Sequence, residues 1–173
     1  MNLKFFAYFI IFFTMISCEP KYKTLDTMIA CAKESKRMDD TLICESQRCF
    51  SRIMKSNSQS LRITYNLPEH LKKGEFFIVY SGNLRTNNAF SEGSIALIIE
   101  GANGQLIHWG AQHIRYHVYE TDTWCKFSDS IKIKYEDWQE KYHRIHVFPF
   151  LGNCNFEKFD VDTLKVTIKE KVS

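Results

Sequence analysis

The side chains of this sequence that could hold a metal ion or move a proton begin with two aspartates near the C-terminus. Asp160 and Asp162 are two residues apart, so on a strand they share one face, about 6.6 Å from each other along the chain. Such carboxylates serve as calcium ligands, since calcium takes several oxygens, or as a catalytic acid–base pair. No companion group accompanies them in the sequence. We therefore rank a solvated strand edge first, a structural calcium site second and catalysis third.

His113 and His117 have the spacing that brings two imidazoles to one metal ion on a helix. The residues from Ile114 to Glu120 are aromatic and β-branched, however, and predict a strand. Four steps along a strand separate the two histidines by about 13 Å, which is too far for one ion. The sequence also contains no G-x-S-x-G, H-E-x-x-H, phosphate-binding or dinucleotide motif. It therefore predicts surface histidines and no catalytic residues.

Three aromatic residues are candidates for a ligand-binding surface: Trp109, Tyr116 and Trp138. Flat apolar faces with a polar rim suit the binding of sugar rings. Trp109 ends a predicted hairpin and Trp138 lies in a polar turn, which favours exposure of both. Trp124 directly precedes a strand and is predicted to pack in the core. Large residues also fill sandwich cores, so packing is the competing role for all of them.

The N-terminus predicts an export signal. A positively charged start, Met1 to Lys4, precedes an uncharged run of 13 residues from Phe5 to Ser17. That run is shorter than the roughly 20 apolar residues needed to cross a bilayer, so it reads as a removable leader. Met15-Ile16-Ser17-Cys18 resembles the lipobox of bacterial lipoproteins, in which the cysteine is lipidated and becomes the mature N-terminus. The resemblance implies a signal peptide over 1–17, a lipidated tether over 18–24 and a single domain over 25–173.

The charge of the chain bears on its class of partner, and its cysteine count bears on disulfide pairing. The net charge is +3, and basic and acidic residues are mixed along the chain without a long run of either sign, so no nucleic-acid partner is predicted. Lipidation of Cys18 leaves an odd number of cysteines, so at least one thiol stays unpaired within the chain. The sequence leaves their pairing open: Cys31, Cys44, Cys49, Cys125 and Cys154.

The middle of the chain reads as short strands separated by turn residues, and Asn103-Gly104 is a strong hairpin signal. Few helices, no repeat and no internal domain boundary are typical of an all-β sandwich. The predicted strands are Cys49–Met54, Ser60–Leu67, Phe76–Tyr80, Ser94–Glu100, Gln105–Trp109, Ile114–Glu120, Trp124–Ile133 and Arg144–Phe150.

At both ends of the domain, the spacing of the apolar residues predicts a local structure. Near the C-terminus, Leu164, Val166 and Ile168 alternate in one phase and Phe159 and Val161 in the other, which predicts a β-bulge near Asp162-Thr163. Near the N-terminus, apolar residues at 25, 28, 29 and 32 fit one face of a short helix, with a strand as the alternative.

Four stretches resemble the galactose-binding-like jelly-roll modules of exported proteins from Bacteroidetes-type bacteria. They are Ser46–Leu67, Phe76–Arg85, the hairpin "SIALIIEGANGQLIHW" followed by Trp124, and the closing pair within Arg144–Lys169. The resemblance covers roughly residues 45–170 and implies a jelly-roll β-sandwich, often with a structural calcium ion near the first and last strands. Asp160 and Asp162 lie in the matching final strand.

These observations together predict a lipid-anchored, exported, non-catalytic β-sandwich module. We expect it to lie on the periplasmic or cell-surface side of a bacterial membrane, held through lipid at Cys18. It would bind a ligand, with carbohydrate as the leading class, and would need no cofactor other than a structural calcium ion. A structural or assembly protein that binds envelope proteins is the alternative, and a hydrolase with a dispersed site is the third. The ligand, the membrane leaflet and the oligomeric state are left open.

Overall fold

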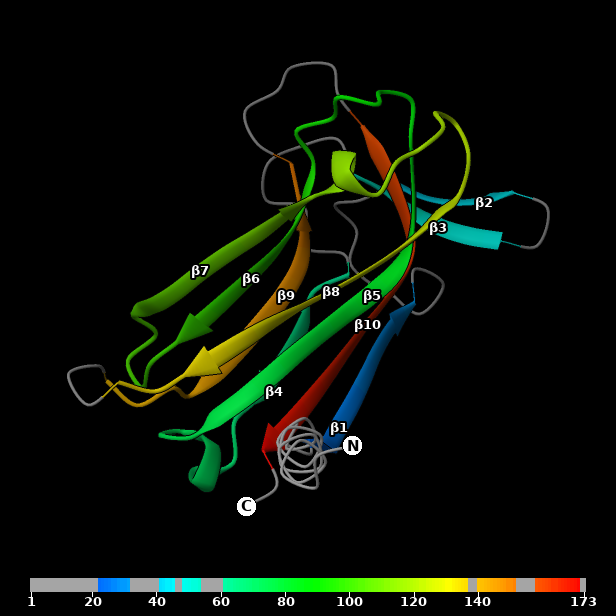
Figure 1. The fold of residues 1–173 in the computed structure, drawn as a ribbon. Coiled ribbons are helices and arrows are strands. Elements are labelled where there is room, and N and C mark those ends of the chain that lie inside the picture. The colour runs from blue at the N-terminus through cyan, green and yellow to red at the C-terminus, as the bar shows by residue number, and fades with distance from the viewer. Residues whose placement is uncertain are drawn as a thin grey trace, which may run out of the picture.

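A computed structural model of the chain shows a fold made of β-strands (Figure 1). The structure describes residues 22–31, 41–45, 48–53, 61–136, 140–151 and 158–171. Cys18, Trp138 and Cys154 therefore lie outside the described residues. Within the described residues, no helix is long and apolar enough to span a membrane.

Two antiparallel sheets form the fold. The larger sheet has the strand order β2-β3-β10-β5-β8, with β1 also paired to β10. Its strands are β1 (Tyr22–Cys31), β2 (Thr41–Glu45), β3 (Arg48–Ile53), β5 (Glu75–Thr86), β8 (Cys125–Lys134) and β10 (Phe159–Lys171).

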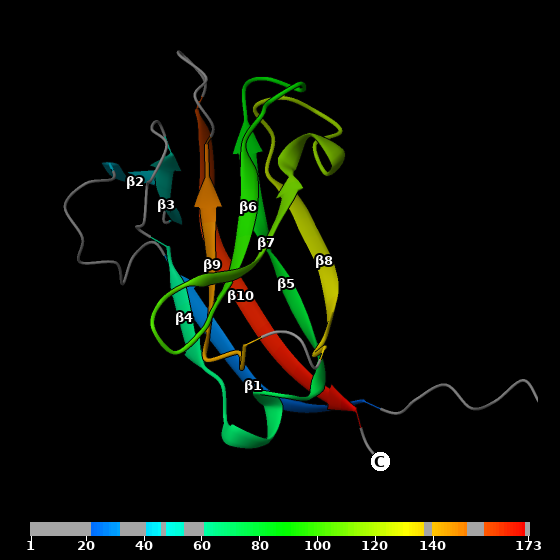
Figure 2. The same ribbon diagram turned by 90° about the vertical axis from the view of Figure 1, so that its left-hand side faces the viewer.

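The smaller sheet has the order β4-β9-β6-β7 and faces the viewer in Figure 2. Its strands are β4 (Ile63–Asn66), β6 (Ser94–Glu100), β7 (Leu106–His113) and β9 (Arg144–Phe150). Among the residues that the structure describes, two short 3-10 helices lie in the connections: η2 (Glu69–Leu71) and η3 (Ile114–Tyr116).

The strand order identifies a jelly roll. Along the chain, the eight strands from β3 to β10 alternate between the two sheets except at the β6–β7 hairpin, and they assemble as β3-β10-β5-β8 against β4-β9-β6-β7. Two four-stranded antiparallel sheets linked in this way are the jelly-roll arrangement. The predicted all-β jelly-roll sandwich is therefore confirmed.

The core lies between the sheets and follows strand alternation. In β6, Ile95, Leu97 and Ile99 are each at most 1% exposed, and they face inward. In β10, register shifts between Val161 and Thr163, as the sequence predicts for a bulge. Because of this shift, apolar side chains on both sides of the bulge are buried: Phe159, Val161, Leu164, Val166 and Ile168.

The predicted N-terminal helix is wrong, because residues 22–31 form strand β1 along β10. A register shift between Thr24 and Asp26 displaces Leu25, so the apolar spacing imitates a helical period. Met28 packs against the core, whereas Ile29 is 58% exposed. The strand alternative is the correct one, and the sheet begins at Tyr22.

The predicted strand over Ile114–Glu120 is also wrong. Ile114 is buried at the start of η3, and residues 117–124 form turns and bends. The hairpin at Asn103-Gly104 is confirmed as the link between β6 and β7, with positive φ at Gly104 alone. Trp124 is half-buried and contacts Phe50 edge-on, with 5.5 Å between the ring centroids.

Gly82 is required by the close approach of β10 at the bulge. A Cβ at this position would fall on the carbonyl oxygen of Thr163 and lie 2.8 Å from Cε1 of Phe127. We expect Gly82→Ala to lower the free energy of unfolding by about 2–3 kcal/mol, because backbone must move to relieve the overlap. Urea denaturation measures this change. Gly110→Ala is the control, since its Cβ would have no neighbour closer than 3.5 Å; an equal loss in both variants would contradict the assignment.

Candidate functional site

The outer face of the smaller sheet carries a set of aromatic, small and polar residues in register. Since Ile95, Leu97 and Ile99 face the core, the even-numbered residues of β6 face outward. Three rows cross β9, β6 and β7 on this face: Phe150, Ser94 and His113; Phe148, Ala96 and Ala111; His146, Ile98 and Trp109.

The alanine row makes a hollow in this face. Ala111 lies between the row with Trp109 and the row with Phe150, and its short side chain leaves space beside these two rings. A cavity of about 470 Å³ occupies this position. We name it the outer-face hollow; its lining residues are Glu92, Ser94, Trp109, Ala111, His113, Arg115 and Phe150.

Trp109 forms an accessible and well-supported wall of the outer-face hollow. It is 44% exposed, and its ring contacts Phe150 and Phe148 edge-to-face, with centroid distances of 5.6 and 6.5 Å. The guanidinium of Arg62 lies 5.4 Å from the centre of the Phe148 ring. Edge-to-face contacts hold the indole in place, so one large apolar side chain is offered to a ligand in a fixed position.

Polar groups border the outer-face hollow near η3. The Ser94 hydroxyl lies 3.1 Å from Nδ1 of His113, and the guanidinium of Arg115 also lines the space. Tyr116 is 58% exposed and contacts two of these residues. Its ring meets that of His113 edge-to-face with 6.1 Å between the centroids, and its ring centre is 5.2 Å from Cζ of Arg115. Tyr116 thus supports the rim and is absent from the lining residues.

A buried histidine, His146, lies in the same row as Trp109, with Ile98 between them. His146 is 4% exposed; Nδ1 lies 2.9 Å from the Thr64 hydroxyl and accepts from Nε of Arg62 at 3.2 Å. Because Arg62 can only donate, the proton of the neutral ring is on Nε2, 3.0 Å from Oε2 of Glu100. Burial lowers the pKa of His146 and outweighs the opposing effect of Glu100.

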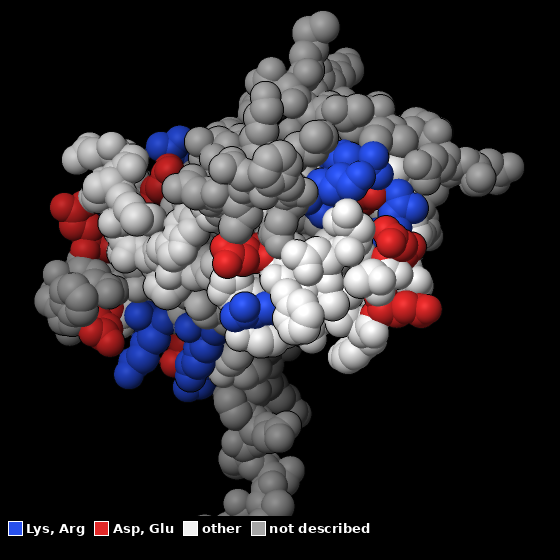
Figure 3. Space-filling view, turned by 90° about the horizontal axis from the view of Figure 1, so that it is seen from above, with Lys and Arg blue, Asp and Glu red and all other residues white. Residues whose placement is uncertain are grey.

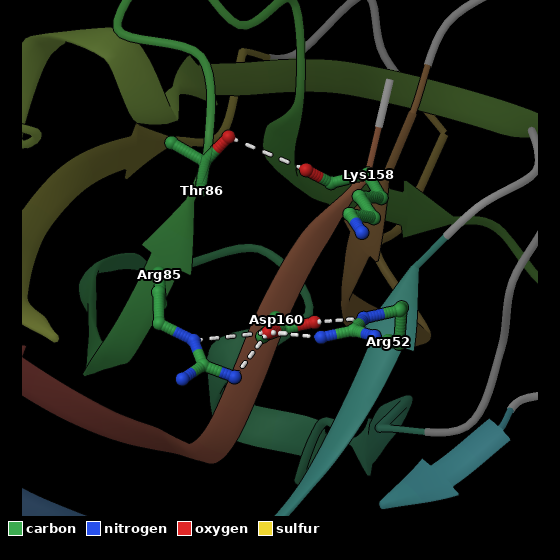
Figure 4. Close-up of polar contacts among 5 residues, drawn as sticks. All are labelled: Arg52, Arg85, Thr86, Lys158 and Asp160. Atoms are coloured by element: carbon green, nitrogen blue, oxygen red, sulfur yellow. Dashed lines mark hydrogen bonds and ion pairs between the residues drawn. The ribbon is translucent and has the colours of Figure 1, made fainter. Parts of the chain in front are cut away.

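The two predicted calcium ligands lie on the other sheet. Asp160 is held between Arg52 and Arg85, with oxygen–nitrogen distances of 2.8 Å to each (Figure 4). Asp162 accepts a hydrogen bond from Nδ2 of Asn83 at 3.0 Å. In the described part of the chain, no three His, Cys, Asp or Glu side chains are grouped as metal ligands. The solvated strand edge that the sequence favours is wrong, because Asp160 and Asp162 are 4% and 8% exposed on a strand inside the sheet. Calcium at these residues stays a prediction.

Sequence reasoning places Trp109 correctly on an exposed surface but misses the partners that make a site. Phe148, Phe150 and Ala111 carry no motif, and only the register of three strands brings them beside Trp109. Arg52 and Arg85 were also missed, because they are 108 and 75 residues from Asp160 in the chain. Cys125 is a free thiol.

The pKa of His146 predicts how stability depends on pH. The unfolded chain titrates this histidine near its ordinary pKa of about 6.5, whereas the folded chain binds the proton only at lower pH. The unfolded state therefore takes up more protons below pH 6.5, and the free energy of unfolding decreases on acidification through this range. Burial also lowers the pKa of His108, which adds an effect of the same sign.

We expect His146→Asn to flatten the decrease in stability between about pH 7 and pH 5. Urea denaturation at a series of pH values measures the slope for the wild type and the variant. His70→Asn provides a control, since His70 is an exposed residue at an ion pair with Glu170 on another part of the surface. An unchanged slope in His146→Asn would contradict the assigned protonation.

Comparison with known proteins gives resemblance in fold only. No protein-family model matches the chain, and no curated protein matches it. Among solved structures, a family 6 carbohydrate-binding module is 17% identical, with 84% of this chain and 94% of that chain covered and a TM-score of 0.42. The CBM22-1 xylan-binding domain of Paenibacillus barcinonensis Xyn10C is 11% identical, with 90% and 100% covered and a TM-score of 0.44.

The VP2 protein of an infectious bursal disease virus particle is 7% identical, with 87% of this chain and 33% of that chain covered and a TM-score of 0.49. A xylan-binding domain and a viral particle protein thus resemble the chain to a similar extent. Similarity at this level assigns no function, because one sandwich architecture serves many unrelated roles.

Proposed function

We propose that this protein is a non-catalytic module that binds carbohydrate in the outer-face hollow. The observation that carries the proposal is an exposed Trp109, held in place by its contact with Phe150, at the wall of a cavity of about 470 Å³. Ala111 also lines this cavity, and polar groups border it. Small-molecule sites combine apolar walls with a few placed polar groups in this way, and the volume falls in their usual range of roughly 300–1,000 Å³.

Each part of the outer-face hollow has a partner in a sugar ring. The C–H face of a pyranose is apolar and packs on the Trp109 indole, while its hydroxyls both donate and accept hydrogen bonds. Ser94 and His113 supply hydroxyl and imidazole groups at one border, and Arg115 supplies N–H donors. A ring thus stacks on the aromatic wall and is oriented by the rim.

A binding role fits this lining better than hydrolysis of a glycoside. Glycosidases use two carboxylates that flank the scissile bond. Among the described residues that line the outer-face hollow, Glu92 is the one carboxylate. These residues suit the holding of a sugar and do not supply the second acidic group.

We further propose that lipid on Cys18 anchors the module to a bacterial membrane. The sheet begins at Tyr22, four residues after this cysteine, and Tyr22 pairs with Lys171 at the end of β10. The outer-face hollow lies toward the opposite end, where β6 begins and β7 and β9 end. An anchored molecule would therefore present its cavity away from the bilayer. Acyl chains contribute about 0.8 kcal/mol per buried methylene, so two or more hold a domain stably.

The carbohydrate proposal is tested by Trp109→Ala. We expect the variant to lose binding on a glycan array and to bind any soluble glycan hit at least about tenfold more weakly by calorimetry, because the apolar wall is gone. Ala111→Leu should weaken binding similarly by filling the hollow while it leaves the indole in place.

Tyr119→Ala is the matched control, since Tyr119 is an aromatic residue with 90% exposure that does not line the outer-face hollow. Circular dichroism and thermal unfolding of each variant show whether the fold is retained. If the wild type binds no glycan at high protein concentration, or if Tyr119→Ala weakens binding as much as Trp109→Ala, the proposal is overturned.

Anchoring is tested separately by metabolic labelling with a fatty-acid analogue in a bacterial host. We expect the full chain to carry the label and to sediment with membranes. Cys18→Ala should lose both properties, because the thiol is the attachment point. Cys125→Ala, which removes a thiol within the folded domain, should keep both. Label retained in Cys18→Ala would contradict lipidation at this residue.

A further inference from the structure

The outer face of the larger sheet carries lysines on two of its strands. Phe127 and Ile133 of β8 are buried in the core, so the even-numbered residues of this strand face outward. Beyond the bulge of β10, the odd-numbered residues face outward for the same reason. Strand β5 lies between these two strands (Figure 1). We name this surface the lysine face, after its six lysines: Lys126, Lys132 and Lys134 of β8, and Lys165, Lys169 and Lys171 of β10.

Strand register arranges the six lysines in two columns, with β5 between them. Lys169 of β10 and Lys132 of β8 are both register partners of Phe77. Neighbouring strands are about 4.8 Å apart, so the backbones of the two columns are about 10 Å apart. The column on β8 runs from Lys126 to Lys134, a length of about 26 Å. The lysine face is therefore a long strip, in which a linear molecule could contact several lysines.

Most of the positive charge on the lysine face has no partner within the described residues. Lys132 forms an ion pair with Glu75 at 3.1 Å. In the described part of the chain, the other five lysines form no hydrogen bond or ion pair. Asp162, which adjoins this surface at the bulge, is 8% exposed and accepts a hydrogen bond from Asn83. Six ammonium groups thus stand against these two carboxylates, and one of the two is buried.

The two columns act together on the space over β5. The contact with Lys132 lowers the pKa of Glu75, and the charges of Lys171 and Lys134 lower it further. One carboxylate on β5 therefore feels ammonium groups from both neighbouring strands. An anionic group placed farther along β5 would lie between lysines in the same way.

The excess of one sign ends where β10 begins. There, the carboxylate of Asp160 is shared by Arg52 and Arg85. Figure 3 looks onto that end of the molecule and shows acidic side chains among the basic ones. The unpartnered positive charge therefore belongs to the strip along β5.

Hydroxyl groups lie among the lysines. Ser128 and Ser130 alternate with the lysines of β8 and are exposed. A cavity of about 410 Å³ lies at the end of the lysine face nearest the bulge, and its lining includes Ser81, Ser128, Thr163, Lys126 and Lys165. Serine and threonine hydroxyls both donate and accept hydrogen bonds, whereas lysines only donate. The surface therefore suits a ligand that combines anionic groups with hydroxyls.

We propose that the lysine face binds a linear anionic polysaccharide, which lies along β5 between the two lysine columns. Carboxylate or sulfate groups of the polymer pair with lysines on either side, and its free hydroxyls bond to the serine and threonine hydroxyls. A polymer of dense charge also releases bound counterions when several lysines neutralise it, which favours binding.

A nucleic acid fits the lysine face less well. Single strands are held in large part by bases that stack on aromatic side chains. Tyr22 and Phe77 lie on this face, but their rings already contact each other edge-on, with 4.6 Å between the centroids. Lysines act as point charges and lack the planar fork that matches a phosphate group. The observations therefore favour the polysaccharide.

The lysine face is separate from the outer-face hollow, because the two lie on the outer sides of opposite sheets. Binding at the lysine face is thus a second activity, which does not depend on the carbohydrate binding proposed at Trp109.

The test measures binding of the full chain to immobilised polymers by biolayer interferometry at a series of NaCl concentrations. The polymers are polygalacturonate and dextran sulfate, with dextran as the uncharged comparison and oligothymidylate as the nucleic acid. Every measurement is repeated with Trp109→Ala, so that binding in the outer-face hollow does not contribute. We expect saturable binding of at least one anionic polysaccharide in both chains, with an affinity that falls steeply as salt rises. Dextran should not bind to Trp109→Ala.

Two double variants separate the lysine face from the net charge of the protein. Lys165→Gln with Lys169→Gln should weaken binding of the polysaccharide roughly five- to tenfold and make the salt dependence shallower, because two contacts in one column are lost. Lys141→Gln with Arg144→Gln removes the same charge from exposed side chains before β9 and at its start, in the smaller sheet. This control should leave the affinity within about twofold of the parent. Circular dichroism shows whether each variant keeps the fold.

The proposal is rejected if neither anionic polysaccharide binds saturably, or if the two double variants weaken binding equally, since the response would then follow net charge alone. Tighter binding of oligothymidylate than of both polysaccharides would reject it too, because the surface would then favour nucleic acid. Loss of polysaccharide binding in Trp109→Ala would place the ligand in the outer-face hollow and would likewise exclude the lysine face as its site. Failure of glycan binding at Trp109 alone leaves these outcomes unchanged.

Discussion

The bulge at Asp162 in β10 governs the rest of the structure. Side chains alternate strictly along a strand, so without the bulge either the two apolar core residues before it or the three after it would face solvent. The extra residue resets this alternation, and Phe159, Val161, Leu164, Val166 and Ile168 all reach the core. The same reset directs Asp160 outward between Arg52 and Arg85. The core and the ion pairs of Asp160 thus depend on one local irregularity.

Much of the sandwich could be predicted from local sequence signals. Strands β6 and β9 begin and end where the sequence predicts, because continuous apolar runs are bounded by clear turn residues. The bulge could be predicted too, since two opposite phases of alternation meet within one segment. Strand β1 could not, because its own irregularity between Thr24 and Asp26 imitates a helical period in so short a segment.

The candidate sites were harder to predict, because each depends on register between distant strands. An exposed Trp109 could be expected at the end of a hairpin, but the hollow beside it depends on Ala111 lying between the rows of Trp109 and Phe150. Arg52 and Arg85 are ordinary surface-type residues in the sequence, and only strand register brings both of them to the buried carboxylate of Asp160. The composition of the sequence and the spacing of its residues do not show which residues become neighbours across strands.

The pairing of β1 with β10 has a mechanical consequence under the proposed anchoring. Nine register pairs join the two strands, from Tyr22 opposite Lys171 to Cys31 opposite Thr163. A membrane tether would pull on β1 lengthwise from the Tyr22 end, while a load on a captured ligand would pull the opposite end of the sandwich the other way. Such tension shears the two strands and stretches all of their hydrogen bonds together, instead of peeling them apart in sequence. The topology therefore suits a domain that has to stay folded while it is under traction.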